Sequence, residues 1–335
     1  MSSLRTSLLA LVVLLPASPS FADPVHKSTA APPWADTAGK ARAPALQSDA
    51  SVADFAIKGA YHDCGAMAGG NPGPRDIAGH EPKAAGSYPV FIYLTGTLMK
   101  FNGPEAQRIT QEMAKRGFVA AEVEYDNSAY PYCRSMSAKA KCIFDGKSKA
   151  SAVSQVCARE KADCARGIVV SGFSQGANLA ALSRNENENV RAAYLMGHGD
   201  KALNQFDVSR CADDATTVLA PSQLRSVNGE ADLFFGTALA GVRKQLQKVV
   251  GVQCPEATHC EQTDGSGWFI VESKELEDGA ADHCYFLNKA NTYCSTYDGL
   301  DPTWEKGAEP WSLRPNLDWL ASQVSGTDKL SKASK

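Results

Sequence analysis

Short apolar runs alternate with amphipathic segments along most of the chain. The apolar runs that have the length of buried strands are residues 88–94, 118–125, 167–171, 190–196, 224–228 and 268–272. The segments whose apolar positions have helical spacing are residues 104–116, 147–159, 175–184, 237–250 and 315–324. Buried strands that alternate with amphipathic helices predict an α/β fold, with a mainly parallel central sheet and helices on both faces.

Two longer stretches interrupt this alternation, residues 126–146 and 197–222. Each follows the end of a predicted strand, and we interpret both as loops. Ligands bind beyond the carboxyl ends of the strands in open parallel sheets, so these loops are candidates to wall or cover a site. An ordinary surface excursion explains either loop equally well.

The first residues have the pattern of a cleaved secretory signal. Arg5 is followed by an apolar run at 8–15, which is too short to span a bilayer. Ser20 and Ala22 then supply small residues at the positions that a signal peptidase recognises. We therefore interpret residues 1–22 as a signal peptide and expect the protein to be secreted or periplasmic.

The rest of the chain divides into one long patterned region with a short tail on either side. Residues 23–51 are rich in Ala, Pro and Ser and are expected to be a flexible N-terminal segment. Residues 52–325 are expected to form a single domain, and residues 326–335 a flexible C-terminal tail. No later run is apolar for long enough to predict a transmembrane segment.

The charge is small and evenly distributed. The net charge is -3, and no run of lysines or arginines occurs. This balance favours neither a nucleic acid nor an anionic membrane surface as a partner. We expect a monomer that acts on a small-molecule or polymeric substrate.

The chain contains ten cysteines. Behind a secretory signal an even number of cysteines predicts disulfides, although sequence alone does not fix their pairing. Local pairing gives Cys133–Cys142, Cys157–Cys164, Cys254–Cys260 and Cys284–Cys294, and leaves Cys64–Cys211. Zinc is the alternative, but the chain has no Cys-x-x-Cys pair, so we expect no metal site.

The segment with the strongest chemical signal is Gly172-Phe173-Ser174-Gln175-Gly176. It follows an apolar strand and precedes the small-residue start of a helix, which is the context that a Gly-x-Ser-x-Gly nucleophile turn requires. The two glycines relieve crowding at a sharp turn that exposes the Ser174 hydroxyl. The Gln175 N–H, at a helix N-terminus, would then face a developing oxyanion.

A serine nucleophile needs a histidine base. The histidines that follow Ser174 are His198, His259 and His283. His283 comes after the last predicted strand, where the base belongs in this type of fold, and Cys284 could fix its loop. His198 and His259 remain alternatives, and each of the three could instead be an ordinary hydrogen-bonded histidine.

The acid that orients the base is expected after the preceding strand, and Asp232 is our first choice there. Glu230 is the second, and Asp200 after an earlier strand is an alternative. Asp282 lies beside His283 in sequence and is too close to fold back onto it. Asp232 could instead cap a helix or lie in a solvated turn.

A second oxyanion donor is expected from the loop after the strand at 88–94. Gly96 permits a close backbone approach there, and the Thr97 N–H is the first candidate, followed by Leu98. An ordinary turn is the alternative. Tyr130 and Tyr132 could line an acyl or aromatic subsite, although loop aromatics as often serve packing.

Taken together, residues 88–323 resemble the α/β-hydrolase superfamily. The run GFSQGANLA is similar to the nucleophile turns of its dienelactone-hydrolase, carboxylesterase and cutinase-like branches. The resemblance implies Ser174, Asp232 and His283 as a triad and Gln175 with the Thr97 region as an oxyanion hole. It also implies hydrolysis of carboxylic esters without a cofactor.

The function expected from the sequence is therefore that of a secreted serine esterase which works through an acyl-enzyme. The same triad would also serve an acyltransferase, a thioesterase or an amidase. A non-catalytic secreted binding protein on the same fold is a third possibility. The presence of all three triad residue types argues against it.

Overall fold

The computed structural model describes residues 51–62, 73–128, 133–199, 219–236, 238–287 and 299–324. The chain divides into two units, Met1–Lys40 and Ala41–Lys335, and all the described residues belong to the second. The predicted signal peptide and C-terminal tail lie outside the described residues, as does all of the predicted N-terminal segment except Ser51.

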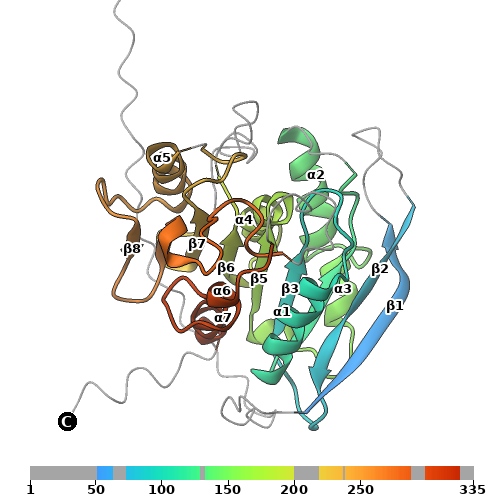
Figure 1. Ribbon diagram of the computed structural model, residues 1–335. Coiled ribbons are helices and arrows are strands. Elements are labelled where there is room, and N and C mark those ends of the chain that lie inside the picture. The colour runs from blue at the N-terminus through green and yellow to red at the C-terminus, as the bar shows by residue number, and fades with distance from the viewer. Residues whose placement is uncertain are drawn as a thin grey trace, which may run out of the picture. The chain divides into compact units, whose positions relative to one another are not determined.

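The centre of the fold is a nine-stranded mixed sheet with the order β1-β2-β4-β3-β5-β6-β7-β9-β8 (Figure 1). The strands from β4 to β9 in this order run parallel to one another, whereas β1, β2 and β8 pair antiparallel. The strands are β1 (Val52–His62), β2 (Pro74–Pro82), β3 (Val90–Leu94), β4 (Val119–Val123), β5 (Ile168–Phe173), β6 (Val190–Met196), β7 (Leu224–Gly229), β8 (His259–Glu261) and β9 (Gly267–Val271).

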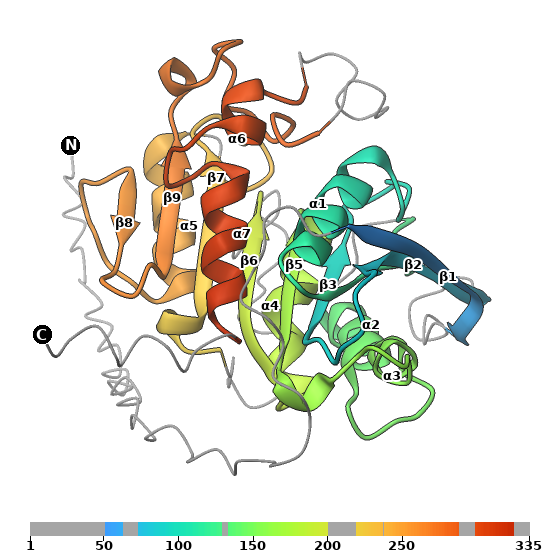
Figure 2. The ribbon, with the colours of Figure 1, turned by 90° about the horizontal axis from the view of Figure 1, so that it is seen from below.

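Helices cover both faces of the sheet, and a separate apolar core lies on each face. In one core the helices α2, α3, α4 and α5 pack on the strands, and in the other α1, α6 and α7 do so (Figure 2). The helices are α1 (Pro104–Lys115), α2 (Cys133–Phe144), α3 (Ala152–Cys157), α4 (Gln175–Glu186), α5 (Leu239–Val250), α6 (Pro302–Lys306) and α7 (Leu313–Ser322). None of the helices in the described ranges is long and apolar enough to cross a bilayer.

The predicted α/β class and mainly parallel sheet are confirmed. All the predicted strands are present, and their ends differ from the expected ones by at most two residues. The predicted helix at 147–159 is wrong over its first turn, because α3 begins only after Ser151. The Ser151 hydroxyl accepts a hydrogen bond from the Ser154 N–H and so caps the helix there.

The stretch 126–146 is not a plain loop, because most of it forms α2. Met136, Ala140, Ile143 and Phe144 are buried, and their spacing of four, three and one residues places them on one face of that helix. The polar and cysteine-rich composition concealed this periodicity in the sequence. Much of the other predicted loop, 200–218, lies outside the described residues.

The sequence pattern also gave no sign of β1 and β2, which extend the sheet at one edge. Tyr61 is the one buried residue of β1, and the apolar residues of the strand do not alternate regularly with polar ones. Tyr61 and Ile77 are the buried apolar side chains that attach this ribbon to the core. An edge strand buries too little apolar surface to show a clear alternation.

Two of the predicted disulfides are present, Cys157–Cys164 and Cys254–Cys260. Cys142 and Cys284 are also disulfide-bonded. The cysteines predicted to pair with them, and the pair predicted to close the longest loop, lie outside the described side chains: Cys133, Cys294, Cys64 and Cys211. The prediction of a disulfide-stabilised fold is therefore supported where the structure describes it.

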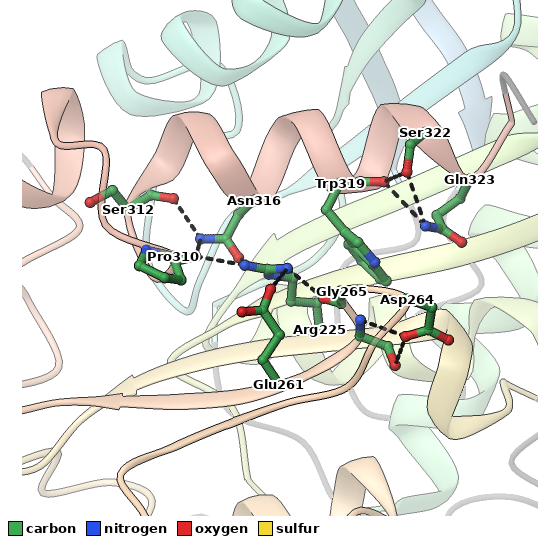
Figure 3. Close-up of polar contacts among 11 residues, drawn as sticks. Arg225, Glu261, Asp264, Gly265, Pro310, Ser312, Asn316, Trp319, Ser322 and Gln323 are labelled. Atoms are coloured by element: carbon green, nitrogen blue, oxygen red, sulfur yellow. Dashed lines mark hydrogen bonds and ion pairs between the residues drawn. The ribbon is translucent and has the colours of Figure 1, made fainter. Parts of the chain in front are cut away.

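A buried arginine joins β7 to the C-terminal helix and to the β8–β9 turn. The Arg225 guanidinium donates to Asn316 Oδ1 at 2.6 Å, to Pro310 O at 2.7 Å and to Glu261 Oε1 at 3.0 Å. It also donates to Gly265 O in the β8–β9 turn (Figure 3). One cation therefore connects three segments that are far apart in sequence, and its burial is offset by charge-assisted hydrogen bonds.

We expect the Arg225→Met variant to lose roughly 2–4 kcal/mol of unfolding free energy, because the buried Asn316 Oδ1 and three partly buried acceptors lose their donor at once. Urea unfolding monitored by circular dichroism measures this loss. Arg314→Met is the matched control, because Arg314 lies exposed on α7 and its loss should cost less than about 0.5 kcal/mol. Equal stability of the two variants would contradict this role for Arg225.

A buried carboxyl lies in the interface between β4 and α1. Glu122 Oε1 is 2.7 Å from Thr110 Oγ1, and the same hydroxyl is 3.0 Å from His80 Nδ1. His80 Nε2 in turn lies 3.4 Å from Asp54 Oδ1 on β1. Burial raises the pKa of Glu122 to about 7, with smaller contributions from Glu105 and Asp54, against the opposing effect of the Thr110 hydrogen bond.

The raised pKa makes stability depend on pH. The folded chain holds the Glu122 proton more tightly than the unfolded chain, so this group's contribution to stability falls as pH rises from about 4.5 through about 7. Glu122→Gln removes that loss and should be more stable than the native chain at pH 8 by roughly 1–3 kcal/mol, but not at pH 4. Urea unfolding at both pH values tests this.

The exposed Glu160 offers a control for the same experiment. Glu160→Gln should follow the pH dependence of the native chain. A Glu122→Gln variant whose stability tracks the native chain from pH 4 to pH 8 would show that Glu122 does not titrate in this range.

Candidate active site

The topology brings two of the predicted site segments together. After β3 the chain adds β4 on one side of it, and it later returns to place β5 on the other side. The strand order therefore reverses between β3 and β5, and ligands of open parallel sheets bind beyond the carboxyl ends of the strands at such a point. Leu94 is paired with Gly172 in register, so the residues after Leu94 lie beside the Ser174 turn.

Ser174 occupies a sharp turn between β5 and α4. Its φ is 53° and its ψ is -117°, which is a conformation that L-residues rarely adopt. A Cβ at Gly172 would lie 2.4 Å from the Gly176 backbone, and one at Gly176 would lie 2.1 Å from Leu94 O. Both glycines are therefore required by close backbone packing, as the sequence motif predicted.

The turn is held from the neighbouring strand as well. The Ser174 N–H donates to Met196 O at the end of β6, at 2.9 Å. At the other side the Ser174 carbonyl accepts from the N–H groups of Ala177 and Asn178 in the first turn of α4. A strained residue persists only where its surroundings fix it in this way.

Asp232 and His283, which are far apart in sequence, are in direct contact. The distance between His283 Nδ1 and Asp232 Oδ2 is 2.8 Å, and the Asp232 side chain is fully buried. The second oxygen of Asp232 accepts from the N–H groups of Phe234 and Phe235 at 2.9 and 3.2 Å. The carboxylate is thus fixed by two backbone donors while it holds one nitrogen of the imidazole.

The imidazole also packs against the residue that precedes Ser174. The Phe173 ring, one residue before Ser174, lies 4.7 Å from the His283 ring between centroids, and Phe234 packs on it at 4.6 Å. A Cβ at Gly197 would lie 2.8 Å from His283 Cε1, so only glycine fits at the end of β6. His283 therefore packs against Phe173, which precedes Ser174, and lies close to Gly197, which follows β6. Because β6 accepts the hydrogen bond of the Ser174 N–H, these contacts place His283 beside the turn.

The segment that carries His283 is fixed against the end of β7. Ala281 O accepts from the Ala231 N–H at 3.0 Å, and a Cβ at Gly229 would lie 2.1 Å from that carbonyl oxygen. Cys284, which directly follows His283, is buried and disulfide-bonded, and that this bond fixes the loop stays a prediction. The two chain segments can therefore approach closely enough for Asp232 to reach His283.

The alternative histidines lie elsewhere. His198 follows β6 and is fully buried, and burial lowers its pKa to about 3, so its ring is neutral near pH 7. The His198 N–H donates to Asn228 Oδ1, and the His198 carbonyl accepts from Asn228 Nδ2. His259 lies on the outermost strand β8, where its ring packs against Phe269.

The alternative acids have other contacts. Glu230 accepts from the Ser273 N–H at 2.6 Å in the segment after β9. Asp282 accepts from the Cys284 N–H at 2.6 Å, and burial raises its pKa. Asp200 lies outside the described residues. Of the described candidates, Asp232 is the carboxylate in hydrogen-bond contact with His283.

The loop after β3 is tied to the loop after β4. The Leu98 N–H donates to Asn127 O at 2.9 Å, so it is not available as an oxyanion donor. The Asn127 side chain donates to Gly96 O and to Met99 O at 2.7 and 2.8 Å. Within the described part of the chain, the Thr97 N–H has no hydrogen-bond acceptor.

The sequence reasoning missed the support that Tyr125 and Asn127 give to this loop. Tyr125 donates from its hydroxyl to Thr95 O at 2.5 Å. Both residues directly follow β4, and that position at the carboxyl edge was the signal that could have identified them. Tyr130 and Tyr132, the predicted substrate contacts, lie outside the described residues. Within the described residues, no group of three or more His, Cys, Asp or Glu side chains could hold a metal ion.

The strain at Ser174 has a measurable cost. Glycine adopts positive φ freely, so Ser174→Gly should be more stable than Ser174→Ala by about 1 kcal/mol. Thermal unfolding of the two variants at one pH measures the difference, and the Ser148→Gly and Ser148→Ala pair, at a partly buried serine, provides the reference for a residue without positive φ. Equal stability of the two Ser174 variants would mean that the turn stores no strain.

No protein-family model matches the sequence, and no curated protein shows significant similarity to it. The interpretation of this site therefore depends on its geometry and on the chemistry of its side chains.

Proposed function

We propose that the protein is a serine hydrolase of the α/β-hydrolase type that cleaves carboxylic esters. The observation that carries the proposal is the hydrogen bond of 2.8 Å between His283 Nδ1 and the buried Asp232, beside a serine held in a strained strand-to-helix turn. The chain order Ser, Asp, His is the one that this fold type uses. The strand order and the two-sided helix packing are compatible with that fold.

In the proposed reaction, Ser174 Oγ attacks the acyl carbon of the ester while His283 Nε2 takes the hydroxyl proton. Asp232 holds the proton on Nδ1 and stabilises the imidazolium that forms. The carbonyl oxygen becomes an oxyanion, which accepts hydrogen bonds from the N–H groups of Gln175 and Thr97. His283 then donates its proton to the leaving alcohol, and water releases the acyl group from Ser174 by the same steps.

The surroundings of the site favour an ester with apolar substituents. Leu98 and Leu233 are the large apolar side chains that are more than half exposed in the described part of the chain. One follows β3 and the other follows β7, so the sheet order places them on opposite sides of the Ser174 turn. An apolar group on either side of the ester bond would cover surface that is otherwise in contact with water.

The disulfides favour action in an oxidising compartment. Within the described residues no cysteine is free. Thiols in reducing compartments rarely form such bonds, so we infer that the enzyme works after export. This agrees with the signal pattern that the sequence shows at residues 1–22.

The proposal predicts hydrolysis of 4-nitrophenyl esters, with higher rates for butyrate or longer acyl chains than for acetate. Ser174→Ala removes the nucleophile and His283→Gln the base, and each should lower kcat by roughly 10⁴-fold or more. Asp232→Asn should lower kcat by about 10⁴-fold, because the imidazole then loses its orientation. A fluorophosphonate probe should label the native chain but not Ser174→Ala. Mass spectrometry of the labelled peptide identifies the residue.

His198→Gln is the matched control, because His198 is the other buried histidine at the carboxyl edge of the sheet. A folded His198→Gln variant should keep its activity within about tenfold, since the ring does not contact Asp232. Full activity of Ser174→Ala would exclude the proposal. Activity towards thioesters or amides without activity towards esters would change the substrate class but keep the nucleophile.

A further inference from the structure

A lysine is buried next to the residue that follows the nucleophile. Lys139 lies on α2 and is 4% exposed. Its ammonium donates to Asp126 O and lies 3.4 Å from Gln175 Oε1, within hydrogen-bond distance. The Tyr125 ring lies 5.9 Å from the same nitrogen. Burial of an ammonium group is costly unless hydrogen bonds compensate for the lost water, so its place inside the protein calls for a role.

The Gln175 amide continues this contact to the loop after β3. Its Nε2 donates to Thr97 Oγ1 at 2.8 Å, while its Oε1 accepts from Lys139. The backbone N–H groups of Gln175 and Thr97 are the two proposed oxyanion donors. One side chain therefore sets the distance between the two segments that carry them, and Lys139 fixes the orientation of that side chain.

The second hydrogen bond of Lys139 reaches the same loop by another route. Asp126 O, which accepts from Lys139, directly precedes Asn127. Asn127 binds Gly96 O and Met99 O through its side chain and accepts from the Leu98 N–H through its backbone. Lys139 thus contacts both supports of the loop after β3, one through Gln175 and one through Asp126.

We propose that Lys139 is a positioning residue for the oxyanion hole, acting through Gln175 on Thr97. This inference rests on the proposed function. Lys139 holds the Gln175 amide so that the donors at Gln175 and Thr97 converge on one oxygen. Such donors stabilise charge that develops only in the transition state, so their misplacement lowers kcat more than it raises KM.

The test is Lys139→Met, which keeps the length of the side chain and removes its donors. With 4-nitrophenyl butyrate as substrate, kcat should fall about 10- to 100-fold while KM changes less than about threefold. Inhibition by phenylboronic acid, which forms a tetrahedral adduct with the serine, should weaken by a similar factor. Lys141→Met is the matched control, because Lys141 is exposed on the same helix, and it should leave all three quantities unchanged.

A second pair of variants tests the route through Gln175. Thr97→Val removes the hydroxyl that accepts from Gln175 but keeps the backbone N–H, and it should lower kcat, whereas Thr97→Ser should restore it. The double variant Lys139→Met with Thr97→Val should be no slower than the slower single variant, since both break one chain of contacts. Thr97→Val and Thr97→Ser still test the proposal if Lys139→Met does not fold.

The outcomes separate this inference from the proposed function. An inactive Ser174→Ala together with native kcat in folded Lys139→Met would refute the positioning role alone. The positioning role would also be refuted if the kcat losses of the two single variants multiplied in the double variant. It would be refuted as well if Lys139→Met changed KM and thermal stability but left inhibition by phenylboronic acid unchanged. An active Ser174→Ala would remove both proposals together.

Discussion

The backbone turn at Ser174 is the constraint on which the rest of the site depends. A residue with positive φ and a side chain is unfavourable by itself, so the surrounding packing must compensate for it. The packing does so where β5, α4 and the loop after β3 touch, with Gly172 and Gly176 at the two places where no Cβ fits. The turn lies at the centre of the sheet, where flanking strands and helices restrict it most.

Around this turn the site is assembled from contacts that only the folded chain can make. Asp232 and His283 lie 51 residues apart in sequence, and their contact requires the segment before His283 to lie against Gly229. The ring of His283 is then in contact with Phe173 and Phe234 and lies close to Gly197, which directly follows β6. Apolar packing on the ring faces and one hydrogen bond to Nδ1 determine where the other nitrogen can point.

The local parts of this arrangement were predictable from the sequence, and the parts made by distant contacts were less so. The strand, the glycines and the helix start around Ser174 show their period and spacing within ten residues. Asp232 was preferred to Glu230 because apolar residues follow it, and Asp282 was set aside because it is adjacent to His283. Both choices depended on the order Ser, acid, His that the resemblance to α/β-hydrolases implies. α2 was missed because its buried face is formed by spaced single residues in a polar background, and Lys139 was missed with it.

β7 shows how stability and the proposed chemistry are coupled. Near its amino end Arg225 is bonded to α7 and to the β8–β9 turn, and beyond its carboxyl end the chain delivers Asp232 to His283. A strand that is fixed only by its ladder hydrogen bonds can shift along its neighbours, and a shift of one residue reverses every side chain. Because the guanidinium binds acceptors on α7 and in the β8–β9 turn, its hydrogen bonds oppose such a shift of β7. The buried charge near the amino end of the strand thus supports the position of Asp232 beyond its carboxyl end.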